Sequence, residues 1–261
     1  MKKIYYITAV FATLFLVGCG DGIDLPGVNV ETDLNKIPLP DNNVNLEQVE
    51  LKPSTEPMLH EGLHTEEDFQ RIRDKKAAGE EPWVSAYQLL VESQFSQKTA
   101  DTYPTEWIKR GISGDENYMN AARGATIVYQ QALRWKIEQD DEYAAKAVEN
   151  LNKWVQTCVG VTGNTNLSLA AGLYGYEFAI AGELLRDYGG WDRADFAAFQ
   201  NWLLKVFYPA NDDFLKRHHD TNALHYWANW CLCNIAAKMA IGIVTDRRDI
   251  YNEGIAHLQT G

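Results

Sequence analysis

The sequence predicts an all-α protein in which antiparallel helical hairpins form an (α/α) toroid or an incomplete barrel. From residue 60 onward, apolar residues recur at helical spacing, and no long stretch alternates with the period of two that marks a half-buried strand. The links between successive helices are short and polar or contain glycine, which is typical of antiparallel helix pairs. A repeat of about 34 residues, which would indicate a helical solenoid, is not found. The toroid is therefore favoured.

The composition is that of a folded chain, not of a disordered, collagenous or multi-pass membrane protein. The 261 residues are 46% apolar and carry 24 Lys+Arg against 36 Asp+Glu, a formal charge of −12. This balance argues against nucleic-acid binding, because no basic stripe exists to displace counterions from phosphates. The 4 cysteines are too few and too scattered for a disulfide framework.

Residues 1–18 are expected to be a lipoprotein signal peptide. A short basic start and an apolar stretch from Ile4 to Phe15 lead into Leu-Val-Gly-Cys, which resembles the bacterial lipobox with Cys19 as the lipidated residue. The apolar stretch is too short to span a bilayer as a permanent helix. An ordinary signal peptide with an incidental cysteine is the alternative. We therefore expect an exported, lipid-anchored protein in the periplasm or at the outer membrane or cell surface of a Gram-negative bacterium.

Residues 19–57 are expected to form a flexible acidic stalk. They are rich in Asp, Asn, Pro and Gly and show no sustained hydrophobic period. Between positions 21 and 50 the stretch holds seven acids and one base, a charge of −6, which is about half of the net charge of the chain. The long-range field of the remaining domain, residues 58–261, is therefore weaker than the total charge suggests.

The predicted helices follow one another from residue 65. Thr65, with the acids behind it, is an N-cap, Gly79 ends that helix, and Pro82 suits the first turn of the next. The fifth helix is small and apolar on most sides, which suggests burial between neighbours. The expected ranges are 65–78, 82–91, 117–137, 141–158, 167–185, 192–207, 221–243 and 246–258.

The densest polar and aromatic stretch, residues 217–230, is the first candidate for a functional segment. On one helix, Asn222, His225 and Asn229 would share a stripe about 60° wide. This stripe would face polar partners or a wet cleft, because a buried polar group without a partner costs about 1–3 kcal/mol. An internal hydrogen-bond network is the alternative. Metal binding is disfavoured, since adjacent histidines diverge and no His-x-x-x-His pair occurs, so we expect neither a metal nor a cofactor.

Asn166 is the second candidate, in the turn before the apolar fifth helix. One interpretation makes Thr165 or Asn166 the N-cap of that helix. The other places the amide of Asn166 at the positive end of the helix, where it suits a carboxylate. Motifs for nucleotide binding, for a nucleophile elbow and for a zinc protease are not found.

From about residue 59 to its end, the chain resembles the alginate lyase superfamily of α/α-toroid polysaccharide lyases, in its Bacteroidetes-type branch. The segments that carry the resemblance are residues 60–73, 166–183, 225–230 and 239–248. The resemblance covers roughly three quarters of the chain and implies β-elimination at a 4-linked uronic acid of an anionic, alginate-like polysaccharide. No metal is needed for that reaction.

The resemblance also implies roles for the candidate residues. Asn166 would bind the C6 carboxylate of the uronic acid, and His225 would neutralise that carboxylate or remove the C5 proton. A further set of polar and aromatic side chains would line the groove and stack on the sugar rings. These are Asn222, Tyr226, Trp227, Asn229 and Trp230, with His219 as a weaker candidate.

This sequence departs from the family pattern in two ways. Some relatives have adjacent Asn and His just ahead of Tyr-Trp, where this chain has Ala223 and Leu224. The family domain normally continues past the point where this chain stops, and its Arg and catalytic Tyr usually lie in that later part. We therefore expect a C-terminally truncated fragment with an unclosed toroid. A polyanion would also need a local basic patch, for which Lys205, Lys216 and Arg217 are the visible candidates.

Three other functions stay open at this point. A non-catalytic surface glycan-binding lipoprotein would use the same aromatic residues without needing His225 or Asn166. An α/α-barrel glycoside hydrolase acting on uronides would need a buried carboxyl group with a raised pKa. A purely structural helical lipoprotein is the last alternative.

Overall fold

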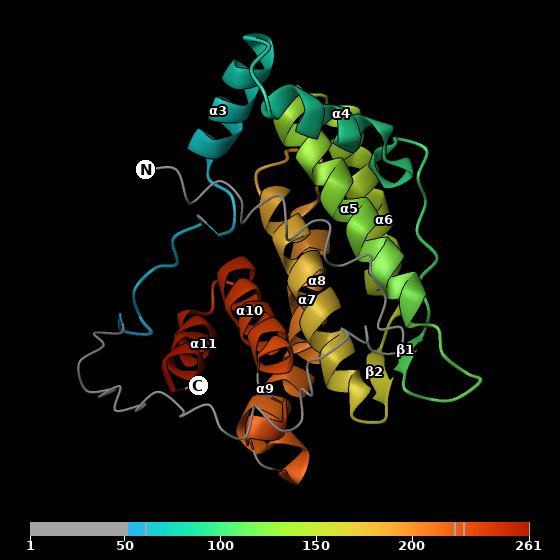
Figure 1. The fold of residues 1–261 in the computed structure, drawn as a ribbon, viewed down its shortest axis with the longest axis vertical. Coiled ribbons are helices and arrows are strands. Elements are labelled where there is room, and N and C mark those ends of the chain that lie inside the picture. The colour runs from blue at the N-terminus through green and yellow to red at the C-terminus, as the bar shows by residue number, and fades with distance from the viewer. Residues whose placement is uncertain (1–51, 61, 222, 227, 261) are drawn as a thin grey trace, which may run out of the picture. The chain divides into compact units, whose positions relative to one another are not determined.

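The computed structural model describes residues 52–60, 62–221, 223–226 and 228–260 (Figure 1). The predicted signal peptide, Cys19 and most of the stalk lie outside these residues and stay predictions, and so do the roles given to Asn222 and Trp227. The helices are α3 (Glu66–Ala77), α4 (Trp83–Glu92), α5 (Tyr118–Glu138), α6 (Asp141–Thr157), α7 (Asn166–Leu184), α8 (Arg193–Val206), α9 (Tyr208–Arg217), α10 (Asn229–Val244) and α11 (Arg248–Thr260). Short 3₁₀ turns are η3 (Gln94–Ser96), η4 (His218–Asp220) and η5 (Ala223–Tyr226), and the strands are β1 (Trp107–Arg110) and β2 (Gly160–Gly163).

The helix starts follow the chemistry of the residues before them. The hydroxyl of Thr65 accepts a hydrogen bond from the backbone N–H of Asp68 at 3.1 Å, and the carboxylate of Asp68 accepts from the backbone N–H of Thr65 at 3.0 Å. This reciprocal capping box confirms the predicted start of α3. Asp140 and Asp192 cap α6 and α8 in the simpler way, each accepting a backbone N–H two residues on. None of the helices in the described ranges is long and apolar enough to cross a membrane.

The helix expected over residues 221–243 begins only at Asn229. Before it, His218, His219 and Asp220 have left-handed backbone angles, with φ of 46°, 54° and 59°. A non-glycine residue pays a steric cost in that region, so this turn cannot continue as a helix. The predicted single-helix stripe of Asn222, His225 and Asn229 is therefore wrong. The segment 208–217, for which no helix was expected, forms α9 with its proline in the first turn.

The two strands form a small parallel sheet, which the sequence analysis did not predict. Trp107 lies opposite Gly160, and Arg110 lies opposite Gly163. Four residues per strand are too few to show a period-two pattern, so the alternation on which strand prediction depends is absent. The sheet fixes the start of α5 beside the start of α7, because each strand leads into one of these helices.

Helices α5, α7 and α10 run parallel to one another. Thr126 of α5 donates a side-chain hydrogen bond to Glu177 of α7, and further along Trp135 packs edge-on against Tyr188 with ring centres 5.6 Å apart. Gly172 of α7 lies against Cys233 of α10, and further along the same direction Arg186 donates to the carbonyl of Val244 at 2.8 Å. The intervening α6 and the α8–α9 pair return the chain to its starting end. This arrangement of hairpins confirms the predicted all-α toroid architecture.

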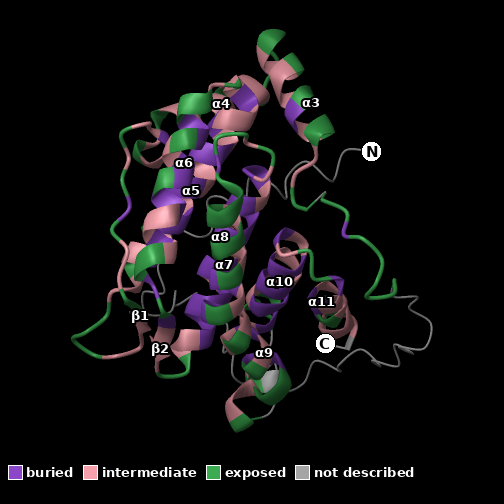
Figure 2. Cartoon of the chain, turned by 180° about the vertical axis from the view of Figure 1, so that it is seen from behind, coloured by how far each residue is buried: buried purple, intermediate pink, exposed green. Residues whose placement is uncertain are grey.

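Helix α7 lies at the centre of this packing (Figure 2). Its buried residues face several neighbours at once, as predicted from its small and apolar sequence. Phe178 illustrates this, with ring centres 5.4 Å from Trp154 of α6, 5.2 Å from Trp202 of α8 and 6.0 Å from Phe207. The segment 52–57 packs elsewhere, where Asn252 of α11 donates to the carbonyl of Lys52.

We expect Gly172→Ala to destabilise the protein by about 1–3 kcal/mol, because overpacking a tight helix contact costs roughly this much. A Cβ at position 172 would lie 2.6 Å from the Sγ of Cys233 and 3.0 Å from its backbone carbonyl carbon. Urea unfolding followed by circular dichroism measures the change. Gly189→Ala is the matched control, since nothing lies within 4 Å of its Cβ position. Equal stability of the two variants would contradict the close contact between α7 and α10.

Glu177 is a half-buried residue of α7 whose carboxyl group faces α5. Burial raises its pKa to about 7, and the hydrogen bond from the side chain of Thr126 offsets part of that rise. His64 lies close by, with its Nε2 2.6 Å from the hydroxyl of Tyr129. Burial lowers the pKa of His64.

We expect Glu177→Gln to flatten the dependence of stability on pH. Between pH 4.5 and about 7, the folded protein keeps a proton on Glu177 that the unfolded chain has released. The contribution of this group to the free energy of unfolding therefore falls as the pH rises through that range. The loss between about pH 5 and pH 8 is at most about 3 kcal/mol and is absent in the variant. Urea midpoints across that range measure it, and the exposed Glu106→Gln is the control. A shared pH profile for both variants and the unchanged protein would show that Glu177 ionises normally.

Candidate functional site

The segments that precede α5, α7 and α10 gather at one end of the helices. We call this end the N-terminal rim and define it by residues 107–117, 160–165, 218–221, 223–226 and 228. The parallel course of the helices places their first turns together, and Figure 1 shows β1 and β2 at the end where α7 begins. Helix starts carry partial positive charge from unpaired N–H groups, so this end favours anions.

Arg110 is the cation of the N-terminal rim. It is the last residue of β1 and is half-buried. Its Nη1 lies 3.4 Å from the hydroxyl of Tyr174 of α7, and its guanidinium carbon lies 4.7 Å from the ring centre of Tyr118 of α5. Among the described residues, no carboxylate forms an ion pair with it. The site therefore keeps a positive charge that is not neutralised by the described part of the chain.

Asn166 is connected to the segment that carries this cation through Asn164. Gly111, which follows Arg110, has a φ of +80°, and a Cβ there would lie 1.9 Å from the Oδ1 of Asn164. That Oδ1 accepts hydrogen bonds from the backbone N–H and the side-chain amide of Asn166, each at 2.9 Å. Asn166 is the first residue of α7 and Thr165 is its N-cap, without a side-chain capping bond. The side-chain carbonyl of Asn166 makes none of these contacts.

His219 lies between α7 and the start of α10. Its Nε2 is 3.1 Å from the Oγ of Ser168, two residues beyond Asn166. Its ring packs edge-on against Tyr226, with centres 5.3 Å apart, and against Trp230, with centres 6.4 Å apart. Three of the predicted residues, His219, Tyr226 and Trp230, are thus in mutual contact. The left-handed turn at 218–220 carries backbone strain, and strained turns are common at functional sites.

His225 and Asn229 are exposed at the same end. The His225 ring lies edge-on to Tyr226 with centres 4.7 Å apart, so Tyr226 contacts two imidazoles, those of His219 and His225. Asn229 is the first residue of α10, and Ala228 before it has a φ of 67°. Asn222 and Trp227, predicted to line the groove, lie outside the described residues.

The predicted basic patch is largely neutralised within the chain. Lys216 pairs with Asp212 at 2.8 Å, and Arg217 pairs with Asp213 at 2.7 Å and with Asp220 at 3.0 Å. These exposed pairs compensate the charges that were expected to attract a polyanion. Lys205 is exposed near the end of α8. Arg110 therefore fits that role better than Lys216 or Arg217.

The thiols near the N-terminal rim are kept protonated. Burial raises the pKa of Cys233 to about 12, and burial also raises the pKa of Cys231. The Sγ of Cys231 lies 3.5 Å from the Nε2 of His218, but the pKa of that imidazole is itself lowered by burial. A thiolate nucleophile is therefore disfavoured here. Within the described ranges, no group of three or more His, Cys, Asp or Glu side chains could hold a metal ion.

Sequence reasoning missed Arg110, Ser168 and Tyr174. Arg110 and Tyr174 are 64 positions apart in the chain, and only the pairing of β1 with β2 brings them together. The local signal that could have pointed to Arg110 is its place directly before Gly111, a glycine with a positive φ. Ser168 carries no signal of its own, because one serine in an apolar helix is read as a packing residue.

The comparisons with known proteins agree with this architecture. The solved structure of alginate lyase A1-III from Sphingomonas species A1 matches with a TM-score of 0.52 at 12% sequence identity, over 74% of this chain and 57% of that chain. This likeness concerns the fold, and the chain spans little more than half the length of that enzyme. No curated protein matches the sequence. The family described as Alginate lyase matches residues 72–261, and the chain belongs to that family.

Proposed function

We propose that the chain is a polysaccharide lyase that cleaves a 4-linked, alginate-like uronic-acid polymer by β-elimination. Membership of the Alginate lyase family supports a polysaccharide lyase in general. The observation that carries the proposal to particular residues is Arg110, a cation without a carboxylate partner among the described residues, held beside Tyr174 and Tyr118 at the N-terminal rim.

The first requirement of this reaction is neutralisation of the C6 carboxylate. The C5 proton is far too weak an acid until the charge that develops on the carboxylate is stabilised. A guanidinium can bind a carboxylate through two parallel hydrogen bonds, and an amide can donate one more. Arg110 and Asn166 are the groups proposed for this role, with the first turn of α7 adding its N–H groups.

The second requirement is the movement of two protons. A base takes the C5 proton, the electron pair forms the C4–C5 double bond, the bond from C4 to the glycosidic oxygen breaks, and an acid protonates that oxygen. The ring of Tyr226 is in edge-on contact with both His219 and His225, so this trio offers groups able to accept one proton and deliver another. We propose His225 as the base, because it is exposed, and Tyr226 as its neighbour in proton transfer.

The glycoside hydrolase alternative has one observation in its favour, the raised pKa of Glu177. Hydrolysis of this kind uses two carboxyl groups that flank the scissile bond. In the described part of the chain, burial raises the pKa of Glu177 without the help of a neighbouring carboxylate. Its side-chain hydrogen bond is with Thr126 of α5, which is not part of the N-terminal rim. The lyase proposal is therefore the better supported of the two.

We expect Arg110→Gln to lower kcat/KM by on the order of 100-fold to 1,000-fold, the usual loss when one charge-stabilising group is removed. The protein is incubated with alginate, polyglucuronate and chondroitin, and the ultraviolet absorbance of the 4,5-unsaturated product is followed. Arg193→Gln, which removes an exposed cation at the start of α8, is the control and keeps full activity. The lyase proposal fails if no folded form releases unsaturated product from any of the three polymers.

We expect His225→Ala to separate the lyase from the glycan-binding alternative. A lyase loses turnover, because its proton-transfer group is gone, while its affinity for a saturated oligouronate falls by less than about tenfold, since an exposed ring contributes little binding energy. Initial rates and isothermal titration calorimetry measure the two quantities. Retention of the full rate would remove His225 from the chemistry. Binding without turnover in the unchanged protein would favour the binding module.

A further inference from the structure

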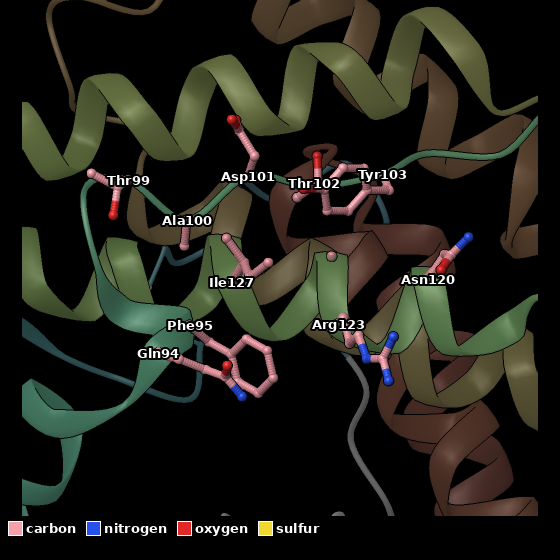
Figure 3. Close-up of a pocket in the computed structure, with 11 residues that line it drawn as sticks. Gln94, Phe95, Thr99, Ala100, Asp101, Thr102, Tyr103, Asn120, Arg123 and Ile127 are labelled. Carbon is pink, nitrogen blue, oxygen red and sulfur yellow. The ribbon is translucent and has the colours of Figure 1, made fainter.

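A second recess lies on another face of α5, between its first turns and the segment that follows η3 (Figure 3). The volume of this pocket is about 310 Å³, at the lower end of the range for small-molecule sites. Figure 3 shows the 99–103 segment on one side of the pocket and Asn120 and Arg123 of α5 on the other. The pocket does not include the residues of the N-terminal rim.

The wall formed by residues 97–103 is held rigidly by buried amides. The Nε2 of Gln131 donates to the carbonyls of Gln97 at 2.9 Å and Ala100 at 3.1 Å. Asn150 of α6 donates to the same carbonyl of Ala100 at 3.0 Å and accepts from the backbone N–H of Thr102 at 3.2 Å. Both amides are fully buried. The shape of the pocket is therefore fixed by the fold and is not a chance gap in a loose loop.

The uncompensated charge in this pocket is positive. Arg123 is exposed and forms no ion pair with any of the residues described in the structure. Asp101, the acid in the lining, is held by Lys146 at 2.7 Å and by Lys153 at 2.9 Å. Hydrogen bonds from these two lysines lower the pKa of Asp101, so its negative charge is both fixed and neutralised. A free guanidinium beside the amide of Asn120 suits a carboxylate.

The same pocket presents an aromatic surface that packing does not explain. Tyr103 is 75% exposed, although a tyrosine normally buries its ring. Phe95 is half-buried at the other end of the lining, and the amide of Gln94 lies beside it. Aromatic faces stack on the C–H faces of sugars, and amides bind hydroxyl groups. An aromatic ring, amides and one free guanidinium together match a sugar that carries a carboxylate.

We propose that this pocket is an accessory binding site for a uronate residue of an acidic saccharide, separate from the N-terminal rim. Arg123 pairs with the carboxylate, Tyr103 stacks on the ring, and Asn120 and Gln94 bind hydroxyls. The choice of a uronate among acidic sugars rests on the proposed lyase function. The two sites lie on different faces of α5, because Asn120, Gly124 and Ile127 of the pocket share one face of the helix, whereas Tyr118, which stacks on Arg110, lies roughly 160° around the helix from Asn120. A polymer held at Arg123 stays attached while another part of it reacts.

Backbone amide shifts of the ¹⁵N-labelled full chain test this site. The Arg110→Gln background slows cleavage of the probe, saturated tetramannuronate, and neutral mannotetraose of equal length is the comparison. We expect tetramannuronate to shift the signals of residues 99–103 and 120–123. We expect Arg123→Gln and Tyr103→Ala each to raise the half-saturating concentration at least tenfold, with Arg193→Gln as the matched control. Both altered residues are exposed, so the variants are expected to fold, which the dispersion of the spectra verifies.

Several outcomes would overturn the accessory site. Signals that do not shift, or that shift equally in Arg123→Gln, remove the proposed role of the guanidinium. Equal shifts with mannotetraose show that the carboxylate is not recognised. Equal saturation by inorganic phosphate, unaffected by Tyr103→Ala, would make the pocket a general anion site. Lyase rates measured separately keep the two proposals apart: binding here without turnover contradicts only the lyase, and turnover without binding here contradicts only this site.

Discussion

The close packing around α7 is the constraint on which the rest of the structure depends. This helix has neighbours on nearly every side, so its side chains must be small wherever another helix crosses it. Gly172 allows the close approach of α10, Gly175 lies against Phe207, and Gly182 lies against the ring of Phe199. Because each contact fixes one neighbour, the direction of α7 also sets the direction of α5 and α10. The positions of Asn166, Ser168 and Tyr174 follow from that single helix.

The sequence predicted the helices with strong local signals and failed where tertiary contacts decide. The N-cap at Thr65 and the acids that follow it are local signals, so the start of α3 was predicted correctly. The seventh helix was expected to begin at about residue 221, yet α10 begins only at Asn229, after a left-handed turn at His218 to Asp220 and a positive φ at Ala228. Tertiary packing holds that turn, because His218 and His219 pack against Phe214, and His219 also contacts Ser168 of α7.

The candidate site divides in the same way. His219, Tyr226 and Trp230 were found because histidines and aromatic residues concentrate in one stretch of sequence, and the structure brings these three together. The sequence could not identify Arg110 as a candidate. What distinguishes it is that no carboxylate among the described residues pairs with its charge, and only the structure shows this. Lys216 and Arg217 are the opposite case. Their charges are visible in the sequence, but only the structure shows that acids neutralise them.

The parallel course of α5, α7 and α10 has a consequence for how such a protein can diversify. Every segment that leads into one of these helices ends at the same side of the fold, and the ionic contacts of His60, Glu183, Arg186 and Asp246 join the chain at the opposite side. The segments proposed to bind substrate and the residues whose ion pairs hold the helices together are therefore different parts of the sequence. If the N-terminal rim binds substrate as proposed, insertions or substitutions in residues 107–117, 160–165, 218–221, 223–226 or 228 can change which substrate it binds, while the contacts at the far side keep the helices in register.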